Sequence, residues 1–137
     1  MNSIKVAYEH DTRKKGIIIM ADMSMHAIPY TQFSMEMRSG RVIKIDDGFT
    51  NLLGYTDEDV ENGLVFKQFV PSIEYDEIIS DLREQFIEKR YACYQHEVVS
   101  KTGQTLQIVA FFTIQNKLLN GHRVLEISIA DITKIMK

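Results

Sequence analysis

The chain has 137 residues, of which 45% are hydrophobic and 26% are charged, and its formal net charge is −3. These values predict one soluble globular domain that needs no metal ion or disulfide to fold. Acidic and basic residues are interspersed along the chain, which argues against a nucleic-acid-binding protein, because such a protein would present a basic face.

The cellular location is predicted from features near the N-terminus and from the apolar runs. The first residues, "MNSIKVAYEHD", do not have the basic-then-apolar pattern of a signal sequence, and the longest apolar runs are too short to cross a bilayer. The single cysteine, Cys93, cannot form a disulfide within the chain, which fits a reducing compartment. We therefore expect a cytoplasmic domain without direct membrane contact, within a parent protein that is either soluble or membrane-bound.

Residues 1–32 differ in pattern from the rest of the chain. The apolar runs "IKVAYEH" and "GIIIMADM" flank the polar turn "DTRKK", a pattern compatible with a hairpin. The following stretch, "MSMHAIPYTQ", is expected to be a linker or cap, because Pro29 disfavours the continuation of regular structure. We assign residues 1–32 to an N-terminal cap or linker segment.

From Phe33 onward the local signals are clearer. The segments "FSMEM" and "RVIKID" predict two strands that are joined by the turn "RSG". The segment "GFTNLLG" predicts a short helix with an apolar face, and Thr56 with Asp59 forms a capping-box-like pair that predicts the start of a second helix.

The segment "PSIEYDEIISDLREQFIEKR" predicts a long helix that begins at Pro71 and Ser72 and ends at Lys89 and Arg90. One apolar stripe at helical spacing is expected to pack on a sheet. It consists of Tyr75, Ile78, Ile79, Leu82 and Phe86.

Three more strands are predicted in "YACYQHEVVS", "TLQIVAFFTI" and "RVLEISIAD", with turns at "KTG" and near "NKLLNGH". Alternating apolar residues mark one face of the last two strands. They are Leu106, Ile108, Ala110, Phe112 and Ile114, followed by Leu125, Ile127 and Ile129. Two strands, then helices, then three strands predict an α+β domain with its helices on one face of an antiparallel sheet.

Over roughly residues 33–137 the chain resembles a PAS sensor domain. The resemblance depends on "SGRVIKIDDGFTNLLGYTDEDV", on "KTG" between two late strands, and on the closing "DIT" at Asp131–Thr133. The family often has Asn where Asp47 stands and Asp-Gly where Thr102-Gly103 stands, and these departures leave the expected fold unchanged. The resemblance implies a PAS-like five-stranded antiparallel sheet with helices packed on one face, around a small pocket or a solid core.

The resemblance also implies a function and a division of the chain. PAS domains sense a ligand, cofactor or partner and bias an output domain, commonly the histidine kinase of a two-component system or a diguanylate cyclase. On this basis residues 33–133 are the PAS domain of a bacterial signalling protein, and residues 134–137 begin a connecting helix to a C-terminal output domain. Asp131 and Thr133 would anchor the last strand and transmit the signal.

Haem and flavin do not fit the sequence. Haem-binding relatives use a His on the long helix, and this helix contains none. Flavin-binding relatives need a reactive Cys near the helical region and polar amides on the strands, where this chain has Val98, Ile108 and Ile129. The histidines of the chain lack the spacing of a metal site. We therefore expect neither haem nor flavin nor a metal, although an unidentified small ligand is compatible with the sequence.

The expected ligand pocket lies on the inward face of the sheet. Its predicted residues are Phe49, Leu53, Leu82, Phe86, Tyr94, His96, Ile108, Ala110, Phe112, Leu125, Ile127 and Ile129. We favour a structural His96 that is hydrogen-bonded within the core. In the alternative, Tyr94 and His96 are the polar groups of an apolar pocket for a small carboxylate or similar ligand.

One measurement separates a sensor from the main alternative, a constitutive dimerisation or scaffold domain with a filled core. A void of more than ~300 Å³ near Tyr94, His96, Ile108 and Phe112 would favour a sensor. An enzyme is not expected, because His96 and Glu97 are adjacent on a strand and point to opposite faces. No nucleophile elbow or phosphate-binding glycine loop occurs in the sequence either.

The outward face of the sheet has an apolar character of its own. Val109 and Phe111 are expected on this side of their strand, next to Gln107 and Thr113. Outward apolar residues predict a covered face, either by the N-terminal segment or by a second copy of the chain. We expect a homodimer.

Overall fold

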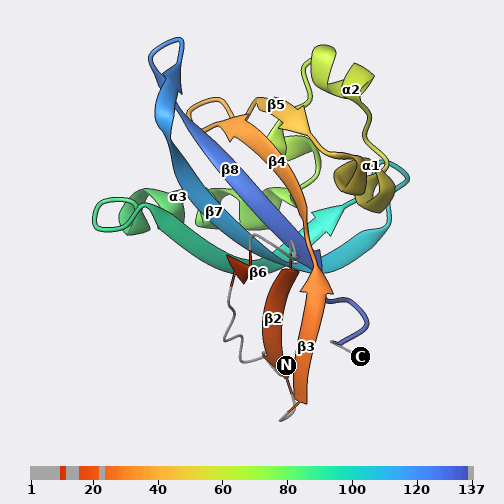
Figure 1. Cartoon of the computed structure of the whole chain (residues 1–137). Coiled ribbons are helices and arrows are strands. Elements are labelled where there is room, and N and C mark those ends of the chain that lie inside the picture. The colour runs from red at the N-terminus through yellow and green to blue at the C-terminus, as the bar shows by residue number, and fades with distance from the viewer. Residues whose placement is uncertain (1–9, 12–15, 22–23, 136–137) are drawn as a thin grey trace.

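The structure, a computed structural model, describes residues 10–11, 16–21 and 24–135, which form two antiparallel sheets and a group of helices (Figure 1). The larger sheet has five strands in the order β5-β4-β8-β7-β6. The strands are β4 (Thr31–Glu36), β5 (Val42–Ile45), β6 (Tyr91–Val99), β7 (Thr105–Leu119) and β8 (His122–Asp131). The helices all lie in the connection between β5 and β6. This architecture confirms the predicted α+β fold with a five-stranded antiparallel sheet.

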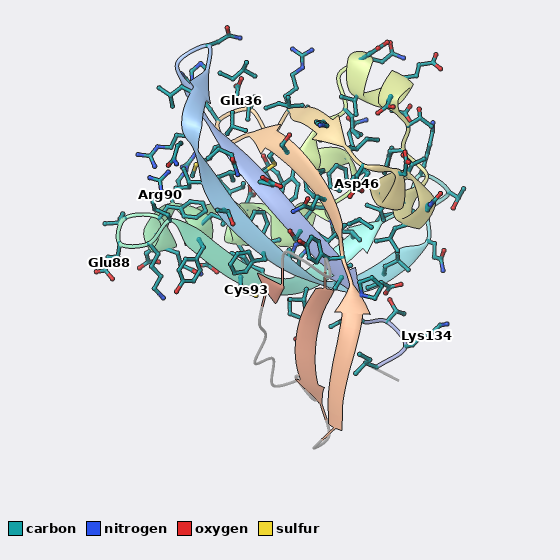
Figure 2. All side chains as sticks on the ribbon, viewed as in Figure 1. Glu36, Asp46, Glu88, Arg90, Cys93 and Lys134 are labelled. Atoms are coloured by element: carbon teal, nitrogen blue, oxygen red, sulfur yellow. The ribbon has the colours of Figure 1, made fainter. Side chains whose placement is uncertain are left out.

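Two short helices follow β5, and both begin as predicted. In α1 (Asp47–Leu53) the N-cap Asp46 accepts a hydrogen bond from the Phe49 amide at 2.8 Å, and a second carboxylate oxygen accepts one from the Gln32 amide of β4 at 2.9 Å (Figure 2). Helix α2 (Asp57–Glu61) begins with the complete capping box of Thr56 and Asp59. Asp46 therefore connects the start of α1 to β4.

The long helix is shorter than predicted. Helix α3 (Ser72–Gln85) ends with Phe86 as its C-cap, so the prediction that Lys89 and Arg90 close it is wrong. The backbone carbonyl of Arg90 instead accepts a hydrogen bond from the Ile114 amide at 2.9 Å, and its side chain donates to Asn116 Oδ1 at 3.1 Å (Figure 2). The chain must leave the helix before Arg90 because this residue already pairs with β7.

The smaller sheet contains β1 (His10–Asp11), β2 (Gly16–Ala21) and β3 (Ser24–Pro29), in that order. The pairing of β1 with β2 confirms the hairpin for the residues described, whereas most of "IKVAYEH" lies outside them. Residues 24–29 form a strand paired with β2, so the expectation that Pro29 interrupts regular structure is wrong, while the role of this segment as a cap or linker stays a prediction. Pro29 is tolerated because it is the last residue of an edge strand.

The main core lies between the inner face of the five-stranded sheet and the helices, and a smaller cluster lies on the outer face. This outer cluster consists of Tyr30, Val109, Ala130 and Ile132, with Ile28 and Ile135 packed against it. Val109 is thus buried as predicted for a covered face, and the segment that precedes β4 provides part of the cover. Phe111 is half-buried and stacks on Tyr91 with 5.7 Å between ring centroids.

Candidate functional site

The predicted pocket residues come together on the inner face of the sheet. Ten of them are buried: Phe49, Leu53, Leu82, His96, Ile108, Ala110, Phe112, Leu125, Ile127 and Ile129. The remaining two, Phe86 and Tyr94, are half-buried and pack against the same core. The alternation of the strands placed the strand residues on the correct face, the helical spacing placed the others, and the role of all of them in ligand binding stays a prediction.

Phe66 occupies the middle of this core. It belongs to a short 3-10 helix, η1 (Phe66–Gln68), that the sequence reading did not predict. Its ring centroid lies 5.5 to 6.5 Å from five other rings. These belong to Phe33, Phe69, Tyr75, His96 and Phe112. Aromatic side chains thus pack beside His96 and Phe112, in the region where a void would have favoured a sensor. The spacing of Phe66 and Phe69 in "VFKQFV" is a signal that could have indicated a buried turn.

His96 is buried and only partly hydrogen-bonded. Its Nδ1–H donates to the carbonyl oxygen of Glu97 at 2.8 Å, in the tautomer that leaves Nε2 as an acceptor. Nε2 has no hydrogen-bond partner among the described residues. Burial lowers the pKa of the imidazole, so the neutral form is favoured. These contacts agree with the structural interpretation of His96.

Tyr94 connects β6 to the end of α3. Its hydroxyl oxygen accepts a hydrogen bond from Gln85 Nε2 at 2.9 Å, and its ring packs edge-on against Phe112 at 5.8 Å. Burial raises the pKa of the phenol to about 12, and the nearby Asp81 carboxylate adds to the shift. Tyr94 is therefore a neutral hydrogen-bonding group at neutral pH.

A cleft of about 320 Å³ opens between α3 and the end of the β4–β8 strand pair. Its apolar wall is formed by Met35, Met37, Ile79, Leu82 and Leu125. Two of these, Leu82 and Leu125, belong to the predicted pocket. Tyr94, His96, Ile108 and Phe112 do not line this cleft. The candidate binding site therefore lies at one edge of the predicted pocket, away from the packed aromatic rings.

The mouth of the cleft carries Arg38, Arg83, His122 and Arg123, together with Gly121. Arg123 is two residues before Leu125 on β8 and so extends along the same face of the sheet, whereas Arg83 is one helical turn after Ile79. The guanidinium groups of these three arginines form no salt bridge within the described part of the chain. Sequence reading missed these residues because they belong to three separate elements.

The exit of the sheet is fixed by hydrogen bonds around Thr133. Asp131 Oδ1 accepts bonds from the Thr133 amide at 2.9 Å and from its hydroxyl at 2.6 Å. The Gln107 amide donates to Thr133 Oγ1 at 3.0 Å, and the Ile132 amide donates to the Gln107 carbonyl at 2.9 Å. The end of β8 is thereby attached to β7. Thr133 to Ile135 form a turn, and the rest of the predicted connecting helix, at 136–137, lies outside the described residues.

A second depression, of about 530 Å³, lies along β4 and β5 and includes residues of the β7–β8 hairpin. Three exposed large hydrophobic side chains line it, namely Ile43, Leu118 and Leu119. We call this surface the hairpin groove. Exposed apolar side chains that gather in one depression are typical of an interaction surface.

Two further features concern metals and membranes. Within residues 10–11, 16–21 and 24–135, no three His, Cys, Asp or Glu side chains cluster as a metal site would require. Of the helices described, none has the length and apolar character needed to span a bilayer.

A scan of the sequence against models of protein families finds no match, and neither does a search of curated proteins. Solved structures do match. The PAS domain of a protein from Colwellia psychrerythraea gives a TM-score of 0.68 at 16% identity, covering 77% of this chain and 87% of that one. A PAS domain from a two-component sensor histidine kinase gives 0.60 at 12% identity, covering 74% and 84%.

A third match is the wild-type PAS-B domain of Drosophila melanogaster Cycle, which was solved with bound ethylene glycol. Its TM-score is 0.57 at 12% identity, and the match covers 74% of this chain and 98% of that one. The chain therefore has the PAS fold, which confirms the resemblance seen in the sequence.

Proposed function

We propose that this domain is a non-catalytic sensory or regulatory module that binds a small ligand in the cleft beside α3. The observation that carries the proposal is the cleft itself, because about 320 Å³ is within the range of ~300–1,000 Å³ that is typical of ligand sites. Its wall is largely apolar and its mouth carries a few polar groups, as in other small-molecule sites.

The proposed signal runs along β8. Leu125 and Arg123 of this strand contribute to the cleft, and the same strand ends at Asp131, whose carboxylate holds Thr133. A ligand that binds two arrangements of β8 unequally shifts the population between them. The output would be a domain of the parent protein, either a histidine kinase or a diguanylate cyclase, in the cytoplasm. The match to a PAS domain from a sensor histidine kinase supports the first choice.

The test is a screen of metabolites by thermal shift, combined with mass spectrometry of the protein as it is purified. A ligand is expected to raise the Tm of the wild type. It should have much less effect on Ile79→Trp, because the larger ring fills the cleft. Ile87→Trp is the matched control, since Ile87 is 81% exposed, lies two residues after the end of α3 and does not line the cleft.

A ligand whose effect survives Ile79→Trp would place the binding site elsewhere. If no compound shifts the Tm and none co-purifies, the second candidate function gains support. This is a constitutive dimerisation or scaffold domain, and the observation that favours it is the packing of Phe66 against five neighbouring rings.

A further inference from the structure

We infer that the ligand of the cleft is a small amphipathic anion, with a carboxylate held by the arginines at the mouth and an apolar body against Met37 and Ile79, the half-buried residues of the apolar wall. This inference rests on the proposed function and adds the chemical class of the ligand. It follows from the separation of apolar and positively charged side chains along the cleft.

The inner part of the cleft is apolar. Met35 and Leu125 are fully buried, Leu82 is 1% exposed, and Met37 and Ile79 are half-buried. Met35 and Leu125 are directly paired across β4 and β8, so they form a continuous surface. The two methionines are unbranched and adapt to differently shaped apolar groups. This part of the cleft is therefore suited to a hydrocarbon chain or ring and offers little to a polar ligand.

The mouth is positively charged, although the whole chain is slightly acidic. The chain has a formal net charge of −3 and six arginines. Three of these arginines lie at the mouth of the cleft. None of the described residues that line the cleft is Asp or Glu. Guanidinium groups bind carboxylates through paired N–H donors, and these three have no carboxylate partner within the described part of the chain. All three arginines are exposed, so their guanidinium groups are accessible to an anion from solution.

The size of the cleft limits the ligand further. A volume of about 320 Å³ is at the lower end of the range for ligand sites, which favours a small ligand. At the mouth, the Met37 amide donates a hydrogen bond to the Arg123 carbonyl at 2.9 Å. This bond fixes Arg123 relative to the segment that follows β4. We therefore expect one carboxylate and a short apolar body.

The inference is tested by titrating the whole chain with three probes, and binding is followed by NMR chemical shifts and calorimetry. Octanoate has both parts, octan-1-ol has the apolar body without the charge, and inorganic phosphate has charge without the body. Octanoate is expected to bind about tenfold more tightly than either probe, because octan-1-ol loses a charge-assisted hydrogen bond and phosphate loses the apolar contacts. Its affinity should fall as salt is added.

Variants at the mouth identify the groups that hold the charge. Arg123→Gln and Arg83→Gln are each expected to weaken octanoate about tenfold while leaving octan-1-ol unchanged. Arg41→Gln is the control, because Arg41 is an exposed arginine close to Arg38 in sequence that does not line the cleft. An unchanged Tm of each variant without ligand shows that the fold is retained.

The results separate the inference from the proposed function. Equal binding of octanoate and octan-1-ol would overturn the anionic preference while the cleft remained a ligand site. Binding of phosphate alone would also overturn the inference, because the apolar wall would then have no role. If none of the probes binds but a neutral metabolite from the screen does, the inference fails and the proposed function stands.

Discussion

At the scale of single residues, the imidazole of His96 contributes a pH-dependent part to the stability of the domain. Its Nε2 is buried without a partner among the described residues, and burial lowers its pKa below the ordinary value of 6.5. The unfolded chain therefore binds a proton at a higher pH than the folded chain does. The contribution of the neutral imidazole to stability is fully present above pH 6.5 and is lost as the pH falls toward the folded pKa.

We predict that His96→Leu loses less stability than the wild type when the pH is lowered from about 7.5 to about 5.5, because leucine has no proton to gain. The measurement is the free energy of unfolding in urea for both proteins at each pH. An identical loss in the two proteins would show that other groups determine the pH dependence.

Sequence reasoning placed His96 correctly but did not identify its neighbours. The alternation of Ala92, His96 and Val98 along β6 is a local property, and it is sufficient to place these side chains on the inner face. The ring of Phe66 reaches His96 from a short turn thirty residues earlier, and no periodicity within either segment indicates that contact. The same holds for the arginines of the cleft, which come from a turn, a helix and a strand.

At the scale of single elements, the end of β8 depends on one hydroxyl group. Thr133 Oγ1 accepts from the Gln107 amide and donates to Asp131, so this side chain joins two strands at the exit. We predict that Thr133→Ala increases amide hydrogen exchange at Gln107 and Ile132 about fivefold, which corresponds to the loss of one hydrogen bond of about 1 kcal/mol.

Thr133→Ser is the control for this prediction, because it retains the hydroxyl group and should exchange at the rate of the wild type. Exchange at Phe112, in the middle of the sheet, should not change in either variant. Unchanged exchange at Gln107 in Thr133→Ala would mean that the backbone bond between Ile132 and Gln107 holds the exit by itself.

The elements that were predicted well have short-range signals, and those predicted poorly depend on contacts with distant segments. The capping box of Thr56 and Asp59 involves residues three apart, so it was visible in the sequence. Helix α3 ends early because Arg90 pairs with Ile114 of another strand. Likewise, β3 forms in spite of Pro29 because β2 provides a partner for it.

At the scale of the whole molecule, the hairpin groove is the surface on which we propose a homodimer. The β7–β8 hairpin projects beyond the other strands (Figure 1), and Leu118 on it is 63% exposed. An apolar side chain this exposed is tolerated more readily if a second copy covers it. The outer cluster around Val109, in contrast, is already covered within one chain.

We predict that the wild type is a dimer in solution and that Leu118→Asp raises its dissociation constant by tenfold or more, since a charge would be buried in the interface. Sedimentation velocity over a range of concentrations measures this change. Ile87→Asp introduces the same charge at a residue that is 81% exposed outside the groove, and it should leave the dimer intact. A wild-type chain that stays monomeric at high concentration would contradict the homodimer.

The outer cluster has a mechanical consequence for the domain. Tyr30 is the residue between β3 and β4, and Ile132 directly follows β8, yet both pack against Val109 and Ala130. The segment that leads into the five-stranded sheet and the segment that leads out of it thus pack in the same buried cluster. A displacement of the small sheet would reach the end of β8 through this cluster, whose residues do not line the cleft. Together with the proposed function, this shared cluster suggests a second route between the two ends of the domain, separate from the route through the cleft.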